Sequence, residues 1–302
     1  MNEITVILVI KGSPPYLAES LKSVKTLATD FIIGDIGMAE KAKKMVLRLA
    51  NTRIITFPYE VLYVELVREQ LKQQATTEWV LFLDPDESLP PSLPQELIDR
   101  MRTTDAVIIP RKNIVFGQWI QHSRWWPDYQ VRLFRKNALT WPTQLHQQPT
   151  VAGTKLSLPP EEKYAIIHHN YEDLDHFLEK ERRYAKAEAQ ERLTSPIPFT
   201  LRHSLDNARS EFIGRYFANE GYKDGMHGLA LALLQMFYPL LVYLYYWEGK
   251  KYQPLESQQK INGQLWNFFK QGSSAIGHWL SKMNLISSTE KIRSKFLEFF
   301  SK

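Results

Sequence analysis

Apolar residues fall into four short blocks in the first part of the chain, and more polar stretches separate them. The blocks lie at residues 4–10, 31–36, 53–57 and 79–83. Because they are almost continuously apolar, they indicate strands that are covered on both faces. Helices are predicted between them, at 16–25, 39–50 and 64–74. This alternation predicts an α/β fold with a parallel sheet, and such sheets bind ligands at the carboxyl ends of their strands.

After Asp86 the pattern changes. A helix is predicted at 95–102, and strand-like runs follow at 106–110, 131–134 and 165–168. From Asp173 onward the chain has a helical pattern, and residues 174–193 combine many charges with few apolar positions, as a surface helix does. We therefore expect an α/β domain at 1–172, followed by a helical extension at 173–220 that packs on it.

A long uncharged stretch lies at residues 229–247. Its length is close to the roughly 20 apolar residues that a membrane-spanning helix needs. Gln235 and Pro239 interrupt it, aromatic residues crowd its second half, and Lys250 and Lys251 follow it. Because tyrosine and tryptophan favour the membrane–water interface, we expect a helix or helical hairpin that lies in the membrane face. A spanning helix and a buried core or oligomer helix are the alternatives.

The last residues add a second amphipathic stretch. Ser287 and Glu290 have the spacing of a helix-capping box, and apolar residues then recur with helical spacing at 292, 296, 299 and 300. This pattern is typical of an interfacial helix, although a surface helix packed on its own domain has it too. We expect residues 221–302 to form membrane-associating helices, through which copies of the chain could also form an oligomer.

Composition and charge narrow the classes of protein. The chain of 302 residues is 44% hydrophobic, which suits a folded protein, and it has no cysteine, which excludes disulfides and thiolate zinc sites. Its net charge of +5 suits a ligand that carries phosphate or an anionic membrane surface. The basic residues are scattered, and no recognition helix or base-stacking motif accompanies them, so we do not expect a nucleic-acid partner.

The fourth apolar block ends in the acidic sequence Asp84-Pro85-Asp86-Glu87. Asp84 and Asp86 are two residues apart, so they face the same way if the strand geometry persists. Paired carboxylates repel each other unless a cation lies between them, and an oxygen-rich site favours Mg²⁺ or Mn²⁺. A polar loop that ends a strand is the alternative. We expect Glu87 to support this loop from behind rather than to bind metal.

Other residues add candidate chemistry. Asp35 ends the second predicted strand, where it can accept hydrogen bonds from a nucleotide base or ribose, although a turn aspartate also fits. Asp128 follows Trp125 and Trp126, and we expect these aromatic rings to desolvate it and raise its pKa towards that of a general base. Aromatic faces of this kind also commonly hold sugar rings. A surface loop with an Asp–Arg pair is the alternative for this segment.

Two histidines are candidates as well. His168 ends an apolar strand-like run, where it can ligate a metal or bind phosphate, and His146 lies in the sequence TQLHQQP. A structural hydrogen-bonding role is the alternative for both residues.

These motifs, in this order, resemble the family 2 glycosyltransferases with the GT-A fold, and among them the bacterial lipopolysaccharide-core β-glucosyltransferase subgroup. The resemblance covers about residues 4–250. It is strongest in TEWVLFLDPDE (77–87), WWPDYQVRLFRK (125–136), QLHQQ (144–148) and HHNYEDLDHFLEKERRYAKAEA (168–189). It implies a Rossmann-like mixed sheet that binds a nucleotide-sugar, usually a UDP-sugar, and inversion at the anomeric carbon.

The resemblance, together with the chemistry of the residues themselves, gives candidate roles in this chain. Asp128 matches the catalytic base. The metal-binding candidates are Asp86, Asp84 and His168. The donor-binding candidates are Asp35, Arg68, Asp84, Arg132 and Arg135. The candidates for contact with the acceptor or sugar are Trp125, Trp126 and His146. The expected acceptor is a lipid-linked or lipopolysaccharide-type glycan, at the cytoplasmic face of the inner membrane.

The chain departs from the family pattern around the expected donor pocket. The first strand ends in Lys11-Gly12-Ser13, Asp35 is followed by Ile36-Gly37-Met38, and Arg68 is followed by Glu69. A catalytically degenerate, membrane-associated binding or scaffold protein of the same fold is therefore the alternative. A nucleotidyltransferase would require a glycine-rich basic loop after the first strand, and Lys11-Gly12-Ser13 is too short for one.

Overall fold

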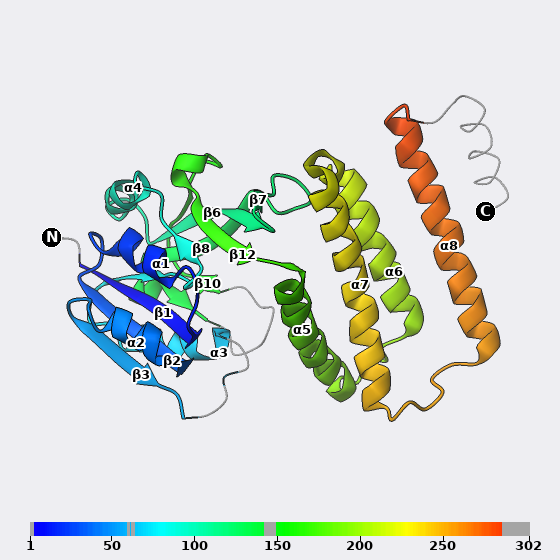
Figure 1. Cartoon of the computed structure of the whole chain (residues 1–302), viewed down its shortest axis with the longest axis horizontal. Coiled ribbons are helices and arrows are strands. Elements are labelled where there is room, and N and C mark those ends of the chain that lie inside the picture. Colours follow the sequence, from blue (N-terminus) through cyan, green and yellow to red (C-terminus); the bar gives the residue numbers. More distant parts are fainter. Residues whose placement is uncertain (1–2, 59–60, 62–63, 142–148, 286–302) are drawn as a thin grey trace. The chain divides into compact units, whose positions relative to one another are not determined.

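The computed structural model describes residues 3–58, 61, 64–141 and 149–285. His146 and the amphipathic stretch after residue 286 lie outside this range. The described chain divides into two compact units. The first contains the residues up to Val115 together with Trp125–Asn170, and the second contains Phe116–Arg124 together with the residues from Tyr171 onward (Figure 1).

The first unit is built on a mixed sheet with the strand order β3-β2-β1-β4-β8-β6-β12-β5. The parallel part consists of β1 (Ile4–Gly12), β2 (Asp30–Met38), β3 (Thr52–Thr56) and β4 (Trp79–Phe82). The remainder consists of β5 (Glu87–Ser88), β6 (Ala106–Val115), β8 (Asp128–Arg135) and β12 (Ile166–Tyr171), with β11 (Lys155–Ser157) paired to β6. A separate antiparallel pair is formed by β9 (Leu139–Thr140) and β10 (Thr150–Val151).

Helices cover both faces of this sheet, as the continuous apolar strands predict. They are α1 (Leu17–Val24), α2 (Glu40–Val46), α3 (Glu65–Gln73) and α4 (Leu93–Arg100), with short 3₁₀ turns at η1 (Lys136–Ala138) and η2 (Glu162–Tyr164). Alternate residues of β1 divide between two cores. Val6 and Leu8 pack with α1, α2 and α4 on one face, while Ile7 and Val9 pack with α3 on the other.

The order and direction of the strands bring distant acidic residues to one edge of the sheet. The parallel strands β2, β1 and β4 end there, and Asp35 lies opposite Ile10 in the β1–β2 pairing. Because β8 runs antiparallel to β4, its first residue, Asp128, lies at this same edge, while Arg135 pairs with Trp79 at the opposite edge. Arg111 of β6 lies directly opposite Asp128. This edge therefore gathers residues from four segments.

The second unit is helical apart from the short strand β7 (Gln118–Trp119). It contains α5 (Leu174–Thr194), α6 (Leu201–Phe212), the π-helical η3 (Ile213–Ala218), the 3₁₀ turn η4 (Gly221–Asp224), α7 (Gly225–Gly249) and α8 (Gln258–Lys282). Helix α7 packs against both α5 and α6, and its core contacts include Ala185, Phe199 and Val242.

Helix α7 contains the uncharged stretch and runs unbroken through Pro239, so a helical hairpin within it is excluded. Two of its polar side chains face α5, where Gln235 donates to Glu181 and the Tyr238 hydroxyl contacts Glu188 at 2.9 Å. Within the described chain, Gly221–Gly249 is the one helical stretch long and apolar enough to cross a membrane, judged by length and composition alone. Of the 18 consecutive residues that are most apolar in this stretch, 28% are buried.

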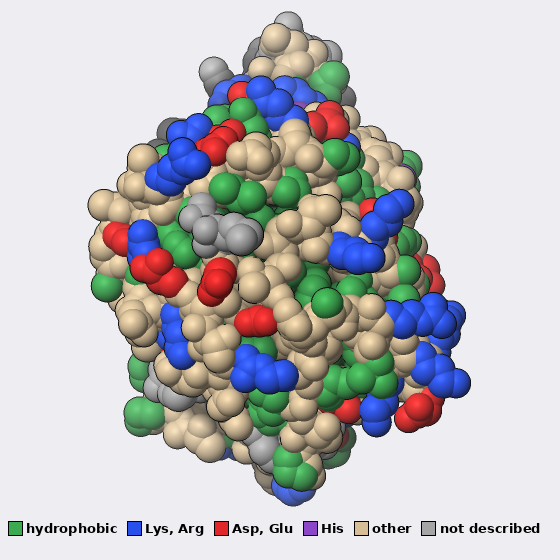
Figure 2. Space-filling model, turned by 90° about the vertical axis from the view of Figure 1, so that its left-hand side faces the viewer, with side chains coloured by type: hydrophobic (Ala, Val, Ile, Leu, Met, Phe, Trp, Pro, Cys, Tyr) green, Lys and Arg blue, Asp and Glu red, His purple; other side chains and the backbone are tan. Residues whose placement is uncertain are grey.

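One face of the first unit gives a view of its surface charge. Figure 2 shows the side that lies at the left of Figure 1, where Lys and Arg side chains are interspersed with Asp and Glu. On that face, the described Lys and Arg side chains do not form the continuous basic surface that nucleic-acid binding favours.

Candidate active site

A network of carboxylates and guanidinium groups occupies the edge where β2, β1 and β4 end. Asp84, just after β4, lies at its centre. Its two carboxylate oxygens accept separate ion pairs, Oδ1 from Arg68 at 3.0 Å and Oδ2 from Arg132 at 2.6 Å. Burial by itself would raise the pKa of Asp84, but these two guanidinium groups, together with Arg111, outweigh it and hold the pKa well below its ordinary value. Asp84 is therefore an ionised anchor.

Glu87 joins this anchor to the neighbouring strand. Its side chain is completely buried, and Oε1 contacts Arg132 at 2.5 Å and Arg111 at 3.1 Å. The other oxygen accepts a hydrogen bond from the backbone N–H of Asp84 at 3.1 Å. Glu87 thus supports the acidic loop from behind, as the sequence predicted.

Asp128 begins β8 and faces Arg111 across the β6–β8 pair. Its Oδ2 accepts hydrogen bonds from Arg111 Nη2 at 2.5 Å and Nε at 2.9 Å, and from Asn113 Nδ2 at 3.1 Å. Oδ1 accepts one from Gln130 Nε2 at 3.0 Å. The expectation of a raised pKa is wrong. Burial does act in that direction, but the Arg111 charge and these hydrogen bonds prevail, so the pKa of Asp128 lies below its ordinary value.

His168, in β12, connects Asp86 with Asn113. The Asn113 amide nitrogen donates to the Trp125 carbonyl and to Asp128, so its oxygen is the atom that faces His168 Nδ1, at 2.6 Å. Because that oxygen can only accept, Nδ1 carries the proton. In the neutral imidazole, Nε2 then carries the lone pair, and it lies 3.6 Å from Asp86 Oδ2.

Asp86 and His168 therefore present an oxygen and a nitrogen ligand to the same point. One or two protein ligands are what a Mg²⁺ or Mn²⁺ ion usually has when substrate phosphates complete its coordination, so this pair fits such an ion. Asp84 fits less well, because both of its oxygens are ion-paired to arginine. Within the described residues, no group of three or more His, Asp or Glu side chains forms a metal site by itself.

Asp35 lies at the same edge but has a local partner. Its Oδ1 accepts hydrogen bonds from the backbone N–H groups of Gly37 at 3.0 Å and Met38 at 2.7 Å. The turn after β2 is therefore stabilised by one oxygen of this carboxylate, in agreement with the turn interpretation of its sequence. Its place beside the end of β1 also keeps it among the donor-binding candidates.

Arg135 is not brought to this network. It lies at the opposite edge of the sheet, where its side chain forms ion pairs with Glu78 and Asp105 and its guanidinium lies 4.9 Å from the centre of the Trp79 ring. The reason is the length of β8, since Arg135 lies seven steps along the extended chain from Asp128, a distance of roughly 23 Å. Trp125 and Trp126 lie just before Asp128, separated from it by Pro127, and are half-buried.

Two residues of the network, Arg111 and Asn113, were not singled out from the sequence. Both lie on β6, two residues apart, so their side chains share one face of the strand. A signal was present, because the polar sequence Arg111-Lys112-Asn113 interrupts a strand that is otherwise apolar. A largely buried strand that carries polar side chains at alternate positions, one of them charged, must face either polar partners or a ligand.

Comparison with known proteins agrees with this architecture. Residues 5–154, just under half of the chain, match the sequence model of the family described as Glycosyl transferase family 2. The first unit, with its mixed sheet and acidic edge, has the GT-A fold that the sequence predicted, and helices follow it.

Solved structures with a similar arrangement are distant. TarS residues 1–349 of S. aureus, in complex with UDP, is 15% identical, with a TM-score of 0.42, and the match covers 84% of this chain and 93% of that one. The same protein in complex with UDP-GlcNAc is 14% identical, with a TM-score of 0.38 and the same coverage. Glucosyl-3-phosphoglycerate synthase from Mycobacterium tuberculosis, in complex with Mn²⁺, UDP and phosphoglyceric acid, is 16% identical, with a TM-score of 0.30. That match covers 38% of this chain and 44% of the synthase chain. At this distance, the compounds in those structures describe those proteins alone.

Proposed function

We propose that this chain is an inverting glycosyltransferase that moves a sugar from a nucleotide-sugar, specifically a UDP-sugar, to a lipid-linked or lipopolysaccharide-type glycan. The β-glucosyltransferase subgroup of lipopolysaccharide-core synthesis is the type its motifs resemble. The observation that carries the proposal is the convergence of Asp84, Asp86 and Asp128 at one edge of a family 2 glycosyl transferase domain, within a network of buried arginines.

The charge balance of this network supports a divalent ion in the reaction. Its three arginines, Arg68, Arg111 and Arg132, are paired to Asp84, Glu87 and Asp128. Among the described residues of this network, each arginine is therefore already paired before a diphosphate arrives. Mg²⁺ or Mn²⁺ held by Asp86 and His168 would supply positive charge beside the diphosphate and stabilise it as it departs.

Asp128 has the properties of a base that is ionised before the substrate arrives. Oδ2 is occupied by Arg111 and Asn113, whereas Oδ1 accepts a single hydrogen bond from the described residues, that of Gln130, so Oδ1 is the atom that receives the proton of the acceptor hydroxyl. Because the pKa of Asp128 is low, it is a weak base towards a free hydroxyl. The proton is therefore transferred late, when attack on the anomeric carbon has acidified the hydroxyl.

The donor would be oriented by residues at the ends of the parallel strands. Asp35 contacts the base or ribose, and Asp84, held by Arg68 and Arg132, accepts hydrogen bonds from the ribose. In this proposal Arg132 acts through Asp84, because its guanidinium is buried and already paired to two carboxylates. Trp125 and Trp126 offer aromatic faces to the sugar or acceptor. The membrane-associated acceptor places the enzyme at the cytoplasmic face of the inner membrane.

A donor screen tests this function. Thermal unfolding of the full chain is measured with a panel of nucleotide-sugars, each with and without Mn²⁺. We expect one UDP-sugar to raise the melting temperature only when Mn²⁺ is present. Turnover of that donor should fall by about 10²-fold or more in Asp128→Asn, while Glu162→Gln, an exposed carboxylate of the same domain, keeps wild-type turnover. If no nucleotide-sugar stabilises the chain, a degenerate scaffold protein is the better assignment.

A further inference from the structure

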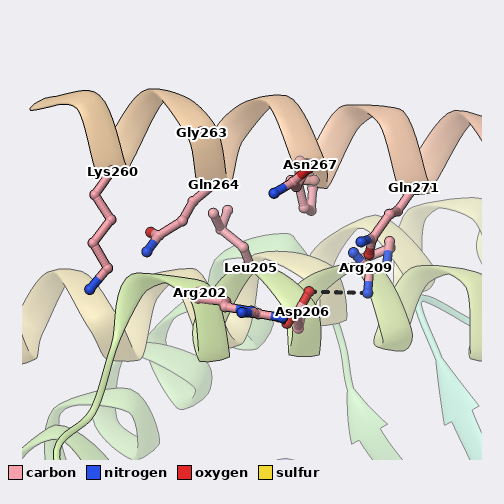
Figure 3. A pocket seen from close by; sticks show the side chains of 10 residues that line it. Arg202, Leu205, Asp206, Arg209, Lys260, Gly263, Gln264, Asn267 and Gln271 are labelled. Atoms are coloured by element: carbon pink, nitrogen blue, oxygen red, sulfur yellow. Dashed lines mark ion pairs between the residues drawn. The ribbon is translucent and has the colours of Figure 1, made fainter. Parts of the chain in front are cut away.

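The first half of helix α8 turns its polar side towards α6. Lys260, Gln264, Asn267 and Gln271 line a cavity of about 500 Å³ between the two helices, opposite Arg202, Asp206 and Arg209 of α6. Figure 3 shows these α8 side chains pointing at α6, where Asp206 is paired to Arg209 at 3.1 Å. Leu205 and Phe268 are the apolar side chains of the lining, so this mostly polar and incompletely filled interface buries little apolar surface.

The opposite side of the same helix is apolar and exposed. Trp266 is 70% exposed and Phe269 is 67% exposed, and Leu265 lies beside them. At 100° per residue, these three positions lie about half a turn from the positions that line the cavity. No residue of α8 is buried, although the helix has 25 residues. Farther along, Trp279 reaches the ring of Phe217, with ring centres 6.2 Å apart. The apolar side of the first half therefore has no partner within the described chain.

The charges of α8 are of one sign. Lys260, Lys270 and Lys282 belong to the helix, and no aspartate or glutamate occurs between Gln258 and Lys282. Lys250 and Lys251 precede it in the connection from α7. A helix with exposed aromatic residues, flanking lysines and no acid has the composition of helices that lie in the plane of a membrane interface.

We propose that the side of α8 formed by Leu265, Trp266 and Phe269 docks onto an anionic lipid bilayer. The inference rests on the membrane location in the proposed function and names the element that makes the contact. Lys260 faces α6 and is paired to Glu256 at 3.6 Å, whereas Lys270 lies next to the apolar side. A bilayer suits this side better than a second copy of the chain does, because an isologous contact between two α8 helices brings their Lys270 side chains together and the helix itself carries no acid to pair them. Anionic lipid headgroups complement the lysines, and the acyl region accepts the aromatic rings.

Helix α7 offers a competing apolar surface in the same unit. Met226, Leu233, Phe237 and Leu244 are exposed along one stripe of it. Residues 229–247 carry no charge, so binding through this stripe would not depend on anionic lipid or on salt. Binding through α8 should depend on both, which separates the two surfaces.

Vesicle co-sedimentation of the full chain tests the proposal. Vesicles of phosphatidylcholine alone are compared with vesicles that also contain phosphatidylglycerol, at low and at high salt. We expect binding to the anionic vesicles, loss of binding at high salt, and a reduction of roughly tenfold or more for each of Trp266→Ser and Phe269→Ser. Lys270→Gln should weaken binding about fivefold. Ile197→Ser, which removes an equally exposed apolar residue from the α5–α6 connection, should bind as the wild type does.

A second readout reports the contact without relying on loss of binding. Because the chain has no cysteine, Phe269→Cys and Gln271→Cys each give a single labelling site for an environment-sensitive fluorophore. We expect a blue shift on anionic vesicles at position 269 and none at 271, on the polar side of the helix. Equal shifts at both positions would overturn the proposal, as would salt-independent binding that Leu233→Ser abolishes.

The remaining outcomes are distinct as well. If light scattering finds a dimer that Trp266→Ser dissociates, and the wild type ignores vesicles, the surface is a contact between copies and the proposal fails. Donor turnover is measured in the same preparations. Because Trp266 and Phe269 lie outside the catalytic unit, turnover tests the proposed function independently of whether the membrane proposal fails.

Discussion

Replacing Arg111 with methionine removes the guanidinium group that joins Asp128 to Glu87. The wild-type contacts are 2.5 Å to Asp128 Oδ2 and 3.1 Å to Glu87 Oε1. Methionine keeps most of the apolar stem of the side chain, so the change is chiefly the loss of charge and hydrogen bonds. Two carboxylates then lose a partner, one of them completely buried.

The size of the effect follows from what each carboxylate retains. Removing one partner of a buried ion pair costs about 3–5 kcal/mol. Here Glu87 keeps Arg132 at 2.5 Å, while Asp128 keeps Asn113 and Gln130 and is partly exposed. We therefore expect a loss near the lower limit, about 3 kcal/mol in the free energy of unfolding. Urea unfolding at neutral pH, followed by circular dichroism, measures it.

The pH dependence provides a second readout. The pKa of Asp128 is depressed in the folded state, so its stabilising effect is present above the pKa of the unfolded chain and is lost as the pH falls through the folded-state value. Arg111→Met should reduce this acid-sensitive part of the stability. It should also move the acid limb of the pH–rate profile for glycosyl transfer to higher pH, because Asp128 loses the cation that lowers its pKa.

Arg111→Lys is the matched control, since it keeps the charge and loses the forked geometry. We expect it to keep the acid limb near its wild-type position while turnover falls. A double-mutant cycle between Arg111→Met and Asp128→Asn should give a coupling energy of about 1–3 kcal/mol. The reasoning is refuted if Arg111→Met unfolds at the wild-type urea concentration and its acid limb does not move.

Three further predictions concern other parts of the molecule. Burial raises the pKa of Glu181 to about 7 from 4.5, so the free energy of unfolding should fall as the pH rises through this window. Glu181→Gln should remove up to about 3 kcal/mol of that loss, as measured by urea unfolding at several pH values. An unchanged pH profile would contradict this. Asn113→Leu should weaken Mn²⁺ binding about tenfold to a hundredfold in calorimetry with the donor present, and unaltered affinity would argue against its positioning role. Gly228→Ala should cost about 2–3 kcal/mol or more in thermal unfolding, because a Cβ there would lie 1.7 Å from the Gly221 carbonyl oxygen. Gly263→Ala is the control and should not destabilise the chain, because nothing lies within 4 Å of a Cβ at that position.

The parallel half of the sheet could be predicted from sequence to within two residues at each strand end. The first strand was expected at 4–10 and spans Ile4–Gly12, and the fourth was expected at 79–83 and spans Trp79–Phe82. These strands are covered on both faces, so burial requires an unbroken apolar run, and such a run is visible locally. The acidic residues after them were found for the same reason, since a carboxylate directly after a buried strand stands out.

The partners of those carboxylates could not be found in this way. Arg111 meets Asp128 because β6 and β8 pair antiparallel in one particular register, and register is set by the whole sheet. The predicted rise in the pKa of Asp128 was wrong for this reason. The prediction considered the aromatic residues next to Asp128 in sequence and missed the Arg111 cation, which lies 17 positions away. Helix α8 was also not predicted separately, since its polar side faces the protein and its apolar side faces outward.

The central claim is that Asp86 helps to hold a divalent ion that a nucleotide-sugar needs in order to bind. Calorimetric titration of the stabilising UDP-sugar into the wild-type chain, Asp86→Ala and Glu162→Ala, each with and without Mn²⁺, tests it most directly. We expect binding to the wild type and to Glu162→Ala only with Mn²⁺, and no measurable binding to Asp86→Ala under either condition. Binding of the donor to Asp86→Ala with wild-type affinity, or to the wild type equally well without Mn²⁺, would contradict the claim.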